Sequence, residues 1–290
     1  LTGQPISEKM NYRRKDGQSI PVAVTVAPMM IGDRPVGSIE VFRDVSLEHE
    51  IDRMKSEFIS LASHQLRTPL SAIKTYSHML VEGFMGPVEP SQKKALHTII
   101  AASNRMNELI STLLNITRIE SGSIAITPKY VNINKLIEEV QKELHHAAND
   151  KNIIMSVVCP SAPLQVRTDN LIAKEILSNI VSNAIKYTPE KGSITIRLRS
   201  RKNDICITVE DTGFGIPAHS QDQIFTKFFR AHNVVKRETS GTGLGLYLVK
   251  GLADVLGGKV WFTSKEDVGS TFYFSLPKQK RPPTPKIKIQ

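Results

Sequence analysis

The feature that most constrains the fold is a pair of long stretches with helical periodicity, separated by a short segment rich in glycine and proline. From about residue 46 to 82, and again from about 91 to 120, apolar residues gather on one side of a helical wheel. Two amphipathic helices joined by one loop form a helical hairpin. The apolar positions are Ile51, Met54, Phe58, Leu61, Ala62, Leu66, Pro69, Leu70 and Ile73, then Leu96, Ile99, Ile100, Met106, Leu109, Ile110, Leu113 and Leu114.

A single hairpin of this kind leaves its apolar stripe half exposed. Pairing two copies would cover the stripe and produce a four-helix bundle. We therefore expect a homodimer through residues 46–122. A monomeric hairpin capped by the next domain is the less favoured alternative.

One histidine of the first helix lies on nearly the opposite side from the apolar stripe. This residue, His64, is therefore expected to face solvent. Pro69 removes the amide that would bond to the Gln65 carbonyl, and this loosens or bends the helix beside His64. For a lone histidine a plain surface position is the better interpretation, so a chemical role for His64 depends on the motifs in the downstream half of the chain.

The hairpin is flanked by two segments with strand patterns. Residues 1–45 alternate apolar and polar residues but are too few to bury a core of their own. Residues 123–277 mix both periodicities and predict an α+β sandwich, with one mixed sheet and helices on one face. Its helices are expected at about 134–149, 169–187 and 244–256, and its strands at about 153–159, 164–168, 193–200, 205–210, 259–264 and 270–276. Residues 278–290 form a basic tail expected to be disordered.

Charge and composition narrow the classes of function. The formal net charge is +10 over 290 residues, but the excess is dispersed or lies in the basic tail, so we expect no nucleic-acid partner. Cys159 and Cys206 lie in apolar strand-like runs and are interpreted as buried thiols of a reducing compartment, which predicts a cytoplasmic location. The chain begins with Leu1 rather than methionine and has no run able to span a bilayer, so a membrane anchor is expected only upstream, if at all.

The predicted helix 169–187 carries a polar face. Glu175, Asn179 and Asn183 are spaced four residues apart and share one side of the helix. Amide and carboxylate oxygens suit Mg²⁺, which also keeps waters and phosphate oxygens, and Lys186 could neutralise phosphate charge. Taken alone, this pattern is better explained as the solvent-facing side of an ordinary helix.

Two glycine-rich stretches come next along the chain. Residues 211–216 come directly after a strand, where glycines let the backbone approach a ligand and Asp211 could accept a hydrogen bond from an amino group such as that of adenine. Residues 241–246 open a helix, whose free amides form an anion site. Residues 241–246 are neither a P-loop nor a dinucleotide-binding fingerprint. The long polar segment 217–240 between them is expected to be a mobile lid.

Five motifs, in this order, resemble those of sensor histidine kinases over about residues 46–277. They are the H box at 64–69, the N box at 179–188, the G1 box at 211–215, the F box at 225–230 and the G2 box at 241–246. The resemblance implies a dimerisation and phosphotransfer hairpin followed by an ATP-binding domain of the Bergerat fold. Residues 1–45 resemble the C-terminal strands of a PAS sensor domain.

By that resemblance, His64 would attack the γ-phosphoryl group of ATP and Asp211 would recognise adenine. The metal would be Mg²⁺, held by Asn183 with help from Asn179, and the helical spacing makes Glu175 a further candidate ligand on the same face. The residues implied in nucleotide binding are Asn179, Asn183, Lys186, Tyr187, Asp211, Gly213, Gly215, Ile216, Phe225, Arg230, Gly241, Thr242, Gly243, Leu244, Gly245, Leu246 and Thr271.

The resemblance also implies a partner, the receiver domain of a response regulator, to which the phosphoryl group would pass. Thr68, one turn beyond His64, could orient a water that dephosphorylates that regulator. Gln65 departs from the family pattern, because an acidic residue usually follows the acceptor histidine as the expected base. An amide cannot take the imidazole proton at neutral pH. We therefore hypothesise that His64 reacts as an already neutral tautomer set by Gln65.

Two other functions are weighed against the kinase. ATPases of the gyrase and chaperone type resemble only the region after residue 170, and they place a glutamate where this chain has Asn179. Because an amide cannot deprotonate water, a transferase is favoured over a hydrolase. A catalytically inactive ATP-binding scaffold is the second rival, and the presence of His64, Asn183 and Asp211 argues against it.

Overall fold

The computed structural model describes residues 6–231, 233 and 241–278. The chain divides into two compact units, one up to Pro69 and one from Leu70 onward, with the boundary inside a long helix. Within the described residues, none of the helices combines the length and the apolar character that crossing a bilayer requires. The basic tail from residue 279 and the lid residues 232 and 234–240 lie outside the described residues.

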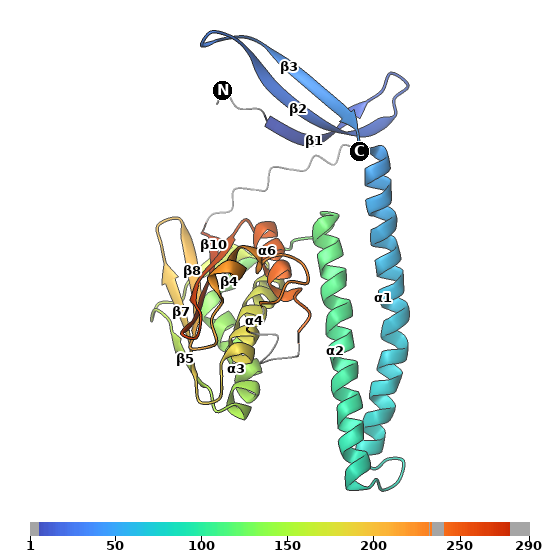
Figure 1. Ribbon diagram of the computed structural model, residues 1–290, viewed down its shortest axis with the longest axis vertical. Helices are drawn as coiled ribbons and strands as arrows, with labels where there is room; N and C mark the ends of the chain where they lie inside the picture. The colour runs from blue at the N-terminus through green and yellow to red at the C-terminus, as the bar shows by residue number, and fades with distance from the viewer. Residues whose placement is uncertain (1–5, 232, 234–240, 279–290) are drawn as a thin grey trace. The chain divides into compact units, whose positions relative to one another are not determined.

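The first unit begins with an antiparallel three-stranded sheet, drawn in blue in Figure 1. Its strands β1 (Ile6–Arg13), β2 (Ser19–Ile31) and β3 (Arg34–Asp44) lie side by side in chain order. Val22 in β2 is fully buried, whereas Phe42 in β3 is 60% exposed. The strands predicted for residues 1–45 are therefore present, and much of their apolar surface is uncovered.

Two long helices come after the sheet. Helix α1 (Ser46–Val81) runs without a break through Pro69, and α2 (Pro90–Glu120) begins after a short loop. Gly83 and Gly86 in this loop have φ of 80° and 102°, which glycine adopts without strain. The predicted order of helix, glycine and proline loop, and helix is confirmed.

The apolar stripe of α1 is exposed within a single chain. Phe58 is 71% exposed and Leu61 is 63% exposed, although Leu70 is only 6% exposed. This exposure agrees with the expectation that a single hairpin leaves its apolar stripe uncovered. His64 itself is exposed, as predicted.

The remainder of the second unit is an α+β sandwich, as predicted. Its five-stranded sheet has the order β5-β7-β8-β10-β9, in which only β5 and β7 run parallel. Three helices contact strands of this sheet and lie along one of its faces (Figure 1). The elements are α3 (Ile133–Asp150), β5 (Ile154–Val158), α4 (Asn170–Tyr187), β7 (Ser193–Ser200), β8 (Asp204–Asp211), α6 (Gly245–Val255), β9 (Lys259–Lys265) and β10 (Gly269–Pro277).

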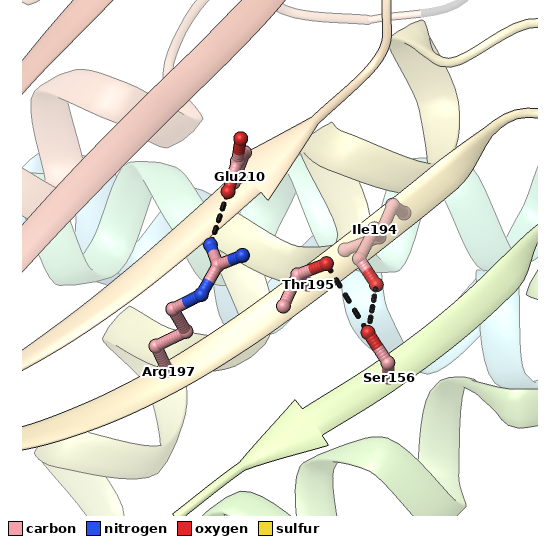
Figure 2. Close-up of polar contacts among 5 residues, drawn as sticks. All are labelled: Ser156, Ile194, Thr195, Arg197 and Glu210. Atoms are coloured by element: carbon pink, nitrogen blue, oxygen red, sulfur yellow. Dashed lines mark hydrogen bonds and ion pairs between the residues drawn. The ribbon is translucent and has the colours of Figure 1, made fainter.

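The two faces of this sheet differ because successive side chains of a strand point to opposite sides. Ile194, Ile196 and Leu198 of β7 are buried in the core, which the three helices complete. The alternate positions are polar and pair across strands (Figure 2). Ser156 donates to the Thr195 hydroxyl at 3.1 Å and to the Ile194 carbonyl at 3.5 Å, and Arg197 forms an ion pair with Glu210.

The structure corrects the predicted topology in two places. A short strand, β4 (Lys129–Asn132), pairs with β6 (Gln165–Thr168) in a separate two-stranded sheet, so the expectation of one mixed sheet is incomplete. Strand β6 is expected from the sequence at about 164–168, whereas the four residues of β4 give no clear alternation. The predicted loop between β8 and α6 also contains a 3-10 helix, η1 (Ala218–Gln223).

Candidate functional site

Helix α4 supplies the central wall of the site. Asp169 caps its first turn by accepting hydrogen bonds from the amides of Leu171 and Ile172, at 3.0 and 3.2 Å. Ile176 and Ile180 bury one side of the helix in the core. This burial leaves the opposite, polar side to face a cavity.

The cavity has a volume of about 1050 Å³ and is large enough for a nucleotide. Its lining brings together most of the residues singled out in the sequence, from α4, from the turn after β8, from the segment after η1 and from the first turn of α6. These residues are Glu175, Asn179, Asn183, Lys186, Tyr187, Asp211, Gly215, Ile216, Arg230, Gly241, Thr242, Gly243, Gly245 and Leu246.

The three candidate metal ligands of α4 share the cavity but differ in their contacts. Glu175 accepts a hydrogen bond from the Asn115 side chain at 2.7 Å. Burial raises the pKa of Glu175, and the bond from Asn115 opposes this shift. Asn179 and Asn183 face the first turn of α6, where a Cβ at Gly245 would lie 3.3 Å from Asn179 Oδ1 and 4.0 Å from Asn183 Nδ2. Amide oxygens beside one carboxyl group fit a magnesium ion that keeps waters and phosphate ligands.

Asp211, at the end of β8, is a buried acid, and one of its carboxylate oxygens is bound by backbone amides. Its Oδ1 accepts hydrogen bonds from the amides of Gly213 and Ser270, at 2.8 and 3.2 Å. Asp211 lines the cavity, and among the described residues none donates a hydrogen bond to its Oδ2. Burial raises the pKa of Asp211 to about 6, against the effect of the two amide bonds.

Two glycines allow the close approaches that shape the cavity. Gly215 has a φ of 60°, and a Cβ there would stand 2.0 Å from the Lys265 carbonyl oxygen. Gly241 has a φ of 135°, and a Cβ there would stand 2.5 Å from Lys186 Nζ. The Lys186 ammonium therefore lies beside the backbone at Gly241, and both residues line the cavity.

Four of the sequence candidates lie outside the cavity lining. Leu244 is 3% exposed and packs in the core, and Phe225 packs edge to face on Phe262. Gly213 supports Asp211 through its amide. Thr271 faces away from the cavity, whereas its neighbours Ser270 and Phe272 line it, because alternate residues of a strand face opposite sides.

The structure adds a wall that sequence reasoning missed. Residues of α2 line the same cavity, and α2 also contacts the F-box segment and α6. Glu120 accepts a hydrogen bond from the Tyr247 hydroxyl at 3.0 Å and forms an ion pair with Lys227. No local pattern in the sequence signals a contact between segments so far apart. The α2 residues in the lining are Ala102, Arg105, Met106, Glu108, Leu109, Ser111 and Thr112.

The H-box residues belong to the unit that ends at Pro69, whereas the cavity belongs to the other unit. His64, Gln65 and Thr68 are all exposed on α1. The Thr68 hydroxyl donates to the His64 carbonyl at 3.5 Å, a long hydrogen bond that leaves the threonine side chain beside the histidine on the next turn.

Two family models match the chain. Residues 54–122 match the "His Kinase A (phospho-acceptor) domain", and residues 168–280 match the "Histidine kinase-, DNA gyrase B-, and HSP90-like ATPase". Together the two matches cover more than half of the chain and include both the exposed histidine and the cavity. The chain belongs to the sensor histidine kinases.

Individual members of the family agree with this assignment. Sensor protein SrrB of Staphylococcus aureus strain N315 is 30% identical over 244 residues, which are 83% of this chain and 41% of SrrB. The chain therefore spans about two fifths of that relative, as it does of SrrB from other strains of the same species. The strands of residues 6–44 lie outside both family matches, so their likeness to a PAS domain stays a prediction.

Solved structures of histidine kinases share the fold. Full-length ShkA in complex with AMPPNP aligns with a TM-score of 0.65 at 24% identity, over 77% of this chain and 46% of that one. Histidine kinase ThkA in complex with response regulator protein TrrA aligns with a TM-score of 0.54 at 22% identity, over 95% of this chain and 79% of that one. The predicted fold class, a helical hairpin followed by an α+β sandwich, is confirmed.

Proposed function

We propose that this kinase uses ATP to phosphorylate its own His64 and then passes the phosphoryl group to an aspartate of a response-regulator receiver domain. The observation that carries the proposal is the division of chemistry between two matched regions. One has an exposed histidine on a helix, and the other has amide, carboxylate, ammonium and glycine-turn groups around a single cavity. The chain spans 41% of its relative, so the activity of the whole protein is a proposal. The support for it is the presence of both the histidine helix and the nucleotide cavity in this chain.

In the proposed complex, adenine donates its amino hydrogen to Asp211 Oδ2. Lys186 and the amides of residues 243–246 hold the phosphates, with support from Tyr187, Arg230 and Thr242. Mg²⁺ would be held by Asn183 with Asn179 and Glu175, and it would supply neutralisation of phosphate charge. The work of these side chains is positioning and charge compensation, which is what phosphoryl transfer chiefly requires.

In the proposed reaction, the lone pair of a neutral His64 imidazole forms a bond to the γ-phosphorus. The bond from that phosphorus to the bridging oxygen breaks, and its electron pair leaves with ADP. The imidazole also loses its ring proton. Gln65 is exposed beside His64 and can orient the ring by hydrogen bonding, but its amide cannot accept the proton. We infer that water takes the proton and that Gln65 is a positioning residue.

The second proposed activity is removal of the phosphoryl group from the regulator. Thr68 supports it, because its hydroxyl is exposed one turn beyond His64 and could orient a water. A gyrase- or chaperone-type ATPase is less well supported, because residues 54–122 match a phospho-acceptor domain and Asn179 lacks the basicity to activate water.

The proposed assembly is a homodimer through residues 46–122, because the apolar stripe of α1 is uncovered in one chain. The proposed domains are a PAS-like segment at 1–45, the dimerisation and phosphotransfer hairpin at 46–122, the ATP-binding domain at 123–277 and a basic tail at 278–290. We place these domains in the cytoplasm, where ATP and response regulators are available.

The test is incubation with ATP labelled on the γ-phosphate. We expect label on the protein that is lost in acid and retained in base, and no label on a His64→Ala variant. His78→Ala is the matched control, because His78 is another exposed histidine of α1. Equal labelling of the parent and the His64→Ala variant would overturn the assignment, and release of free phosphate without protein label would indicate an ATPase.

A further inference from the structure

The last turn of α4 carries several groups of the nucleotide site and ends in backbone carbonyls that the helix itself cannot satisfy. The final carbonyls of any α-helix lack partners within it and need donors from elsewhere. Two of them accept from backbone amides. The Ala184 carbonyl accepts from the Thr188 amide at 3.0 Å, and the Tyr187 carbonyl accepts from the Phe214 amide at 3.1 Å. The carbonyls of residues 185 and 186 remain.

Those two carbonyls are satisfied by a lysine from another helix. Lys151 Nζ donates to the carbonyl oxygens of Ile185 at 3.1 Å and Lys186 at 2.8 Å, and reaches that of Thr188 at 3.5 Å. An ammonium group has three donors, and here they meet three carbonyls. The position also suits a cation, because the C-terminal end of a helix is its negative end.

The backbone of Lys151 is fixed at both sides of the residue. Lys151 is the C-terminal cap of α3, where its amide donates to the Ala148 carbonyl at 3.2 Å. Its own carbonyl accepts from the Lys191 amide at 3.1 Å. The ammonium group is therefore presented from an anchored point, at the junction where α3 ends beside the end of α4.

The turn that Lys151 holds lines the cavity and is bonded to a second segment that lines it. Its residue Lys186 reaches Gly241 through the side chain, and its residue Tyr187 bonds the 211–216 segment through the Phe214 amide. Lys151 itself does not line the cavity. Any influence it has on a nucleotide must pass through the backbone of this turn.

We propose that Lys151 is a positioning residue for the nucleotide site, which holds the last turn of α4 in the geometry that binds the phosphates and supports the adenine-side loop. The proposal rests on the proposed function, since it assumes that the cavity binds ATP. We expect Lys151 to affect ATP binding, through the turn that it holds, rather than the chemical step at His64.

The decisive variant is Lys151→Met, which keeps the length of the side chain and removes its charge and donors. Lys174→Met is the matched control. Lys174 also links α4 to α3, through ion pairs with Glu139 and Glu143, but it lies in the first half of α4 and does not line the cavity. Lys151→Arg is the conservative variant, because it restores a charged donor.

Two measurements are made on the full chain: the ATP dependence of initial labelling rates, and hydrogen exchange of the Phe214 amide. For Lys151→Met we expect KM for ATP to rise about tenfold, since bonds from charged donors are among the stronger ones in proteins. The rate at saturating ATP should stay within about twofold, because His64 is untouched. Exchange at Phe214 should accelerate. Lys151→Arg should recover most of the KM, and Lys174→Met should keep parental values even if it melts at a lower temperature.

A folded Lys151→Met protein with parental KM and parental Phe214 exchange would overturn the proposal while leaving the kinase assignment intact. Should Lys151→Met fail to fold, Lys151→Gln, which keeps two donors without the charge, is judged by the same criteria. If the parent chain itself neither takes up label nor binds ATP, it is the proposed function that fails, and Phe214 exchange still reports whether Lys151 holds the turn.

Discussion

The phospho-acceptor hairpin and the ATP-binding region carry similar helical stripes but bury them differently. In α1, Phe58 is 71% exposed and Leu61 is 63% exposed. In α4, Leu177 is 0% exposed and Ile180 is 1% exposed. Among the described residues, the largest fully buried side chains all come from residues 133–274: Phe274, Ile133, Leu136, Ile137, Ile176, Leu177, Ile180, Ile194, Ile196, Ile205, Ile207 and Leu248.

The difference teaches what helical periodicity does and does not specify. An apolar stripe indicates that a helix needs a covering surface. It does not indicate whether that surface is another element of the same chain, as for α4, or a second copy of the chain, as we propose for α1. The first kind of burial is independent of protein concentration, and the second depends on it.

The strongest way to test this contrast begins with Leu177→Ala. We expect the free energy of unfolding of the ATP-binding region to fall by about 2–5 kcal/mol, because the change leaves a cavity in a closed core. The single tryptophan, Trp261, lies in β9 of that region, so its fluorescence during denaturation reports this loss. The loss should be the same at every protein concentration. A loss that shrinks as protein concentration rises would contradict an intramolecular core.

Leu61→Ala makes the same chemical change at an exposed position of α1. We expect about 2 kcal/mol less stabilisation of the dimer per subunit, since burial of the leucine occurs only on association. Sedimentation equilibrium should show a weaker dimer, while the Trp261 unfolding transition stays where it was. A Leu61→Ala protein that dimerises as tightly as the parent would place the dimer interface elsewhere.

The pH dependence of ATP binding is the next prediction. Burial raises the pKa of Asp211 from 3.8 to about 6, so the folded, ATP-free protein holds this proton between those values and the unfolded chain does not. This contribution to stability is complete below about pH 4 and is lost as the pH rises through about 6. ATP needs the ionised carboxylate as acceptor, so its affinity should fall by up to about tenfold per pH unit below pH 6.

Calorimetric titration with ATP at several pH values measures this effect. Asp211→Asn is the control, because it removes the titrating group: binding should be weaker throughout and should lack this component of the pH dependence. An Asp211→Asn protein with the parental pH dependence would assign the effect to the phosphate groups of ATP instead.

The smallest expected effect is at Gln65. Gln65→Glu introduces a base beside His64, so the pH profile of initial labelling rates should change while ATP affinity stays the same. Ser60→Glu, which adds the same charge one turn before His64 on an exposed position, is the control for electrostatics alone. A profile that is unchanged in Gln65→Glu would contradict a role for Gln65 in the protonation state of His64.

The local elements of the fold could be predicted from sequence because their signals are local. The predicted helix over 169–187 is observed as Asn170–Tyr187, and the predicted strand over 193–200 as Ser193–Ser200. The pairing of β4 with β6 could not be predicted, since it joins two strands of four residues each across more than 30 positions. Pairing over such a distance depends on the packing of everything between.

The site shows the same limit. The types of residue at Asn179, Asn183 and Asp211 indicated a nucleotide, and all three line one cavity. The wall formed by α2, including the hydrogen bond from Asn115 to Glu175, could not be predicted from the spacing of residues in the sequence. Thr271 lies outside the cavity lining for another reason, because a shift of one residue along a strand moves a side chain to the opposite face.

The sequence by itself determined the order of the elements, the chemistry of the candidate site and the exposure of His64, because each follows from periodicity or residue type over a few turns. Only the tertiary structure decided which carbonyls Lys151 satisfies and which oxygen of Asp211 accepts bonds from backbone amides. Those outcomes depend on distances between segments far apart in the chain, and such distances are set by the packing of the whole core rather than by any local pattern.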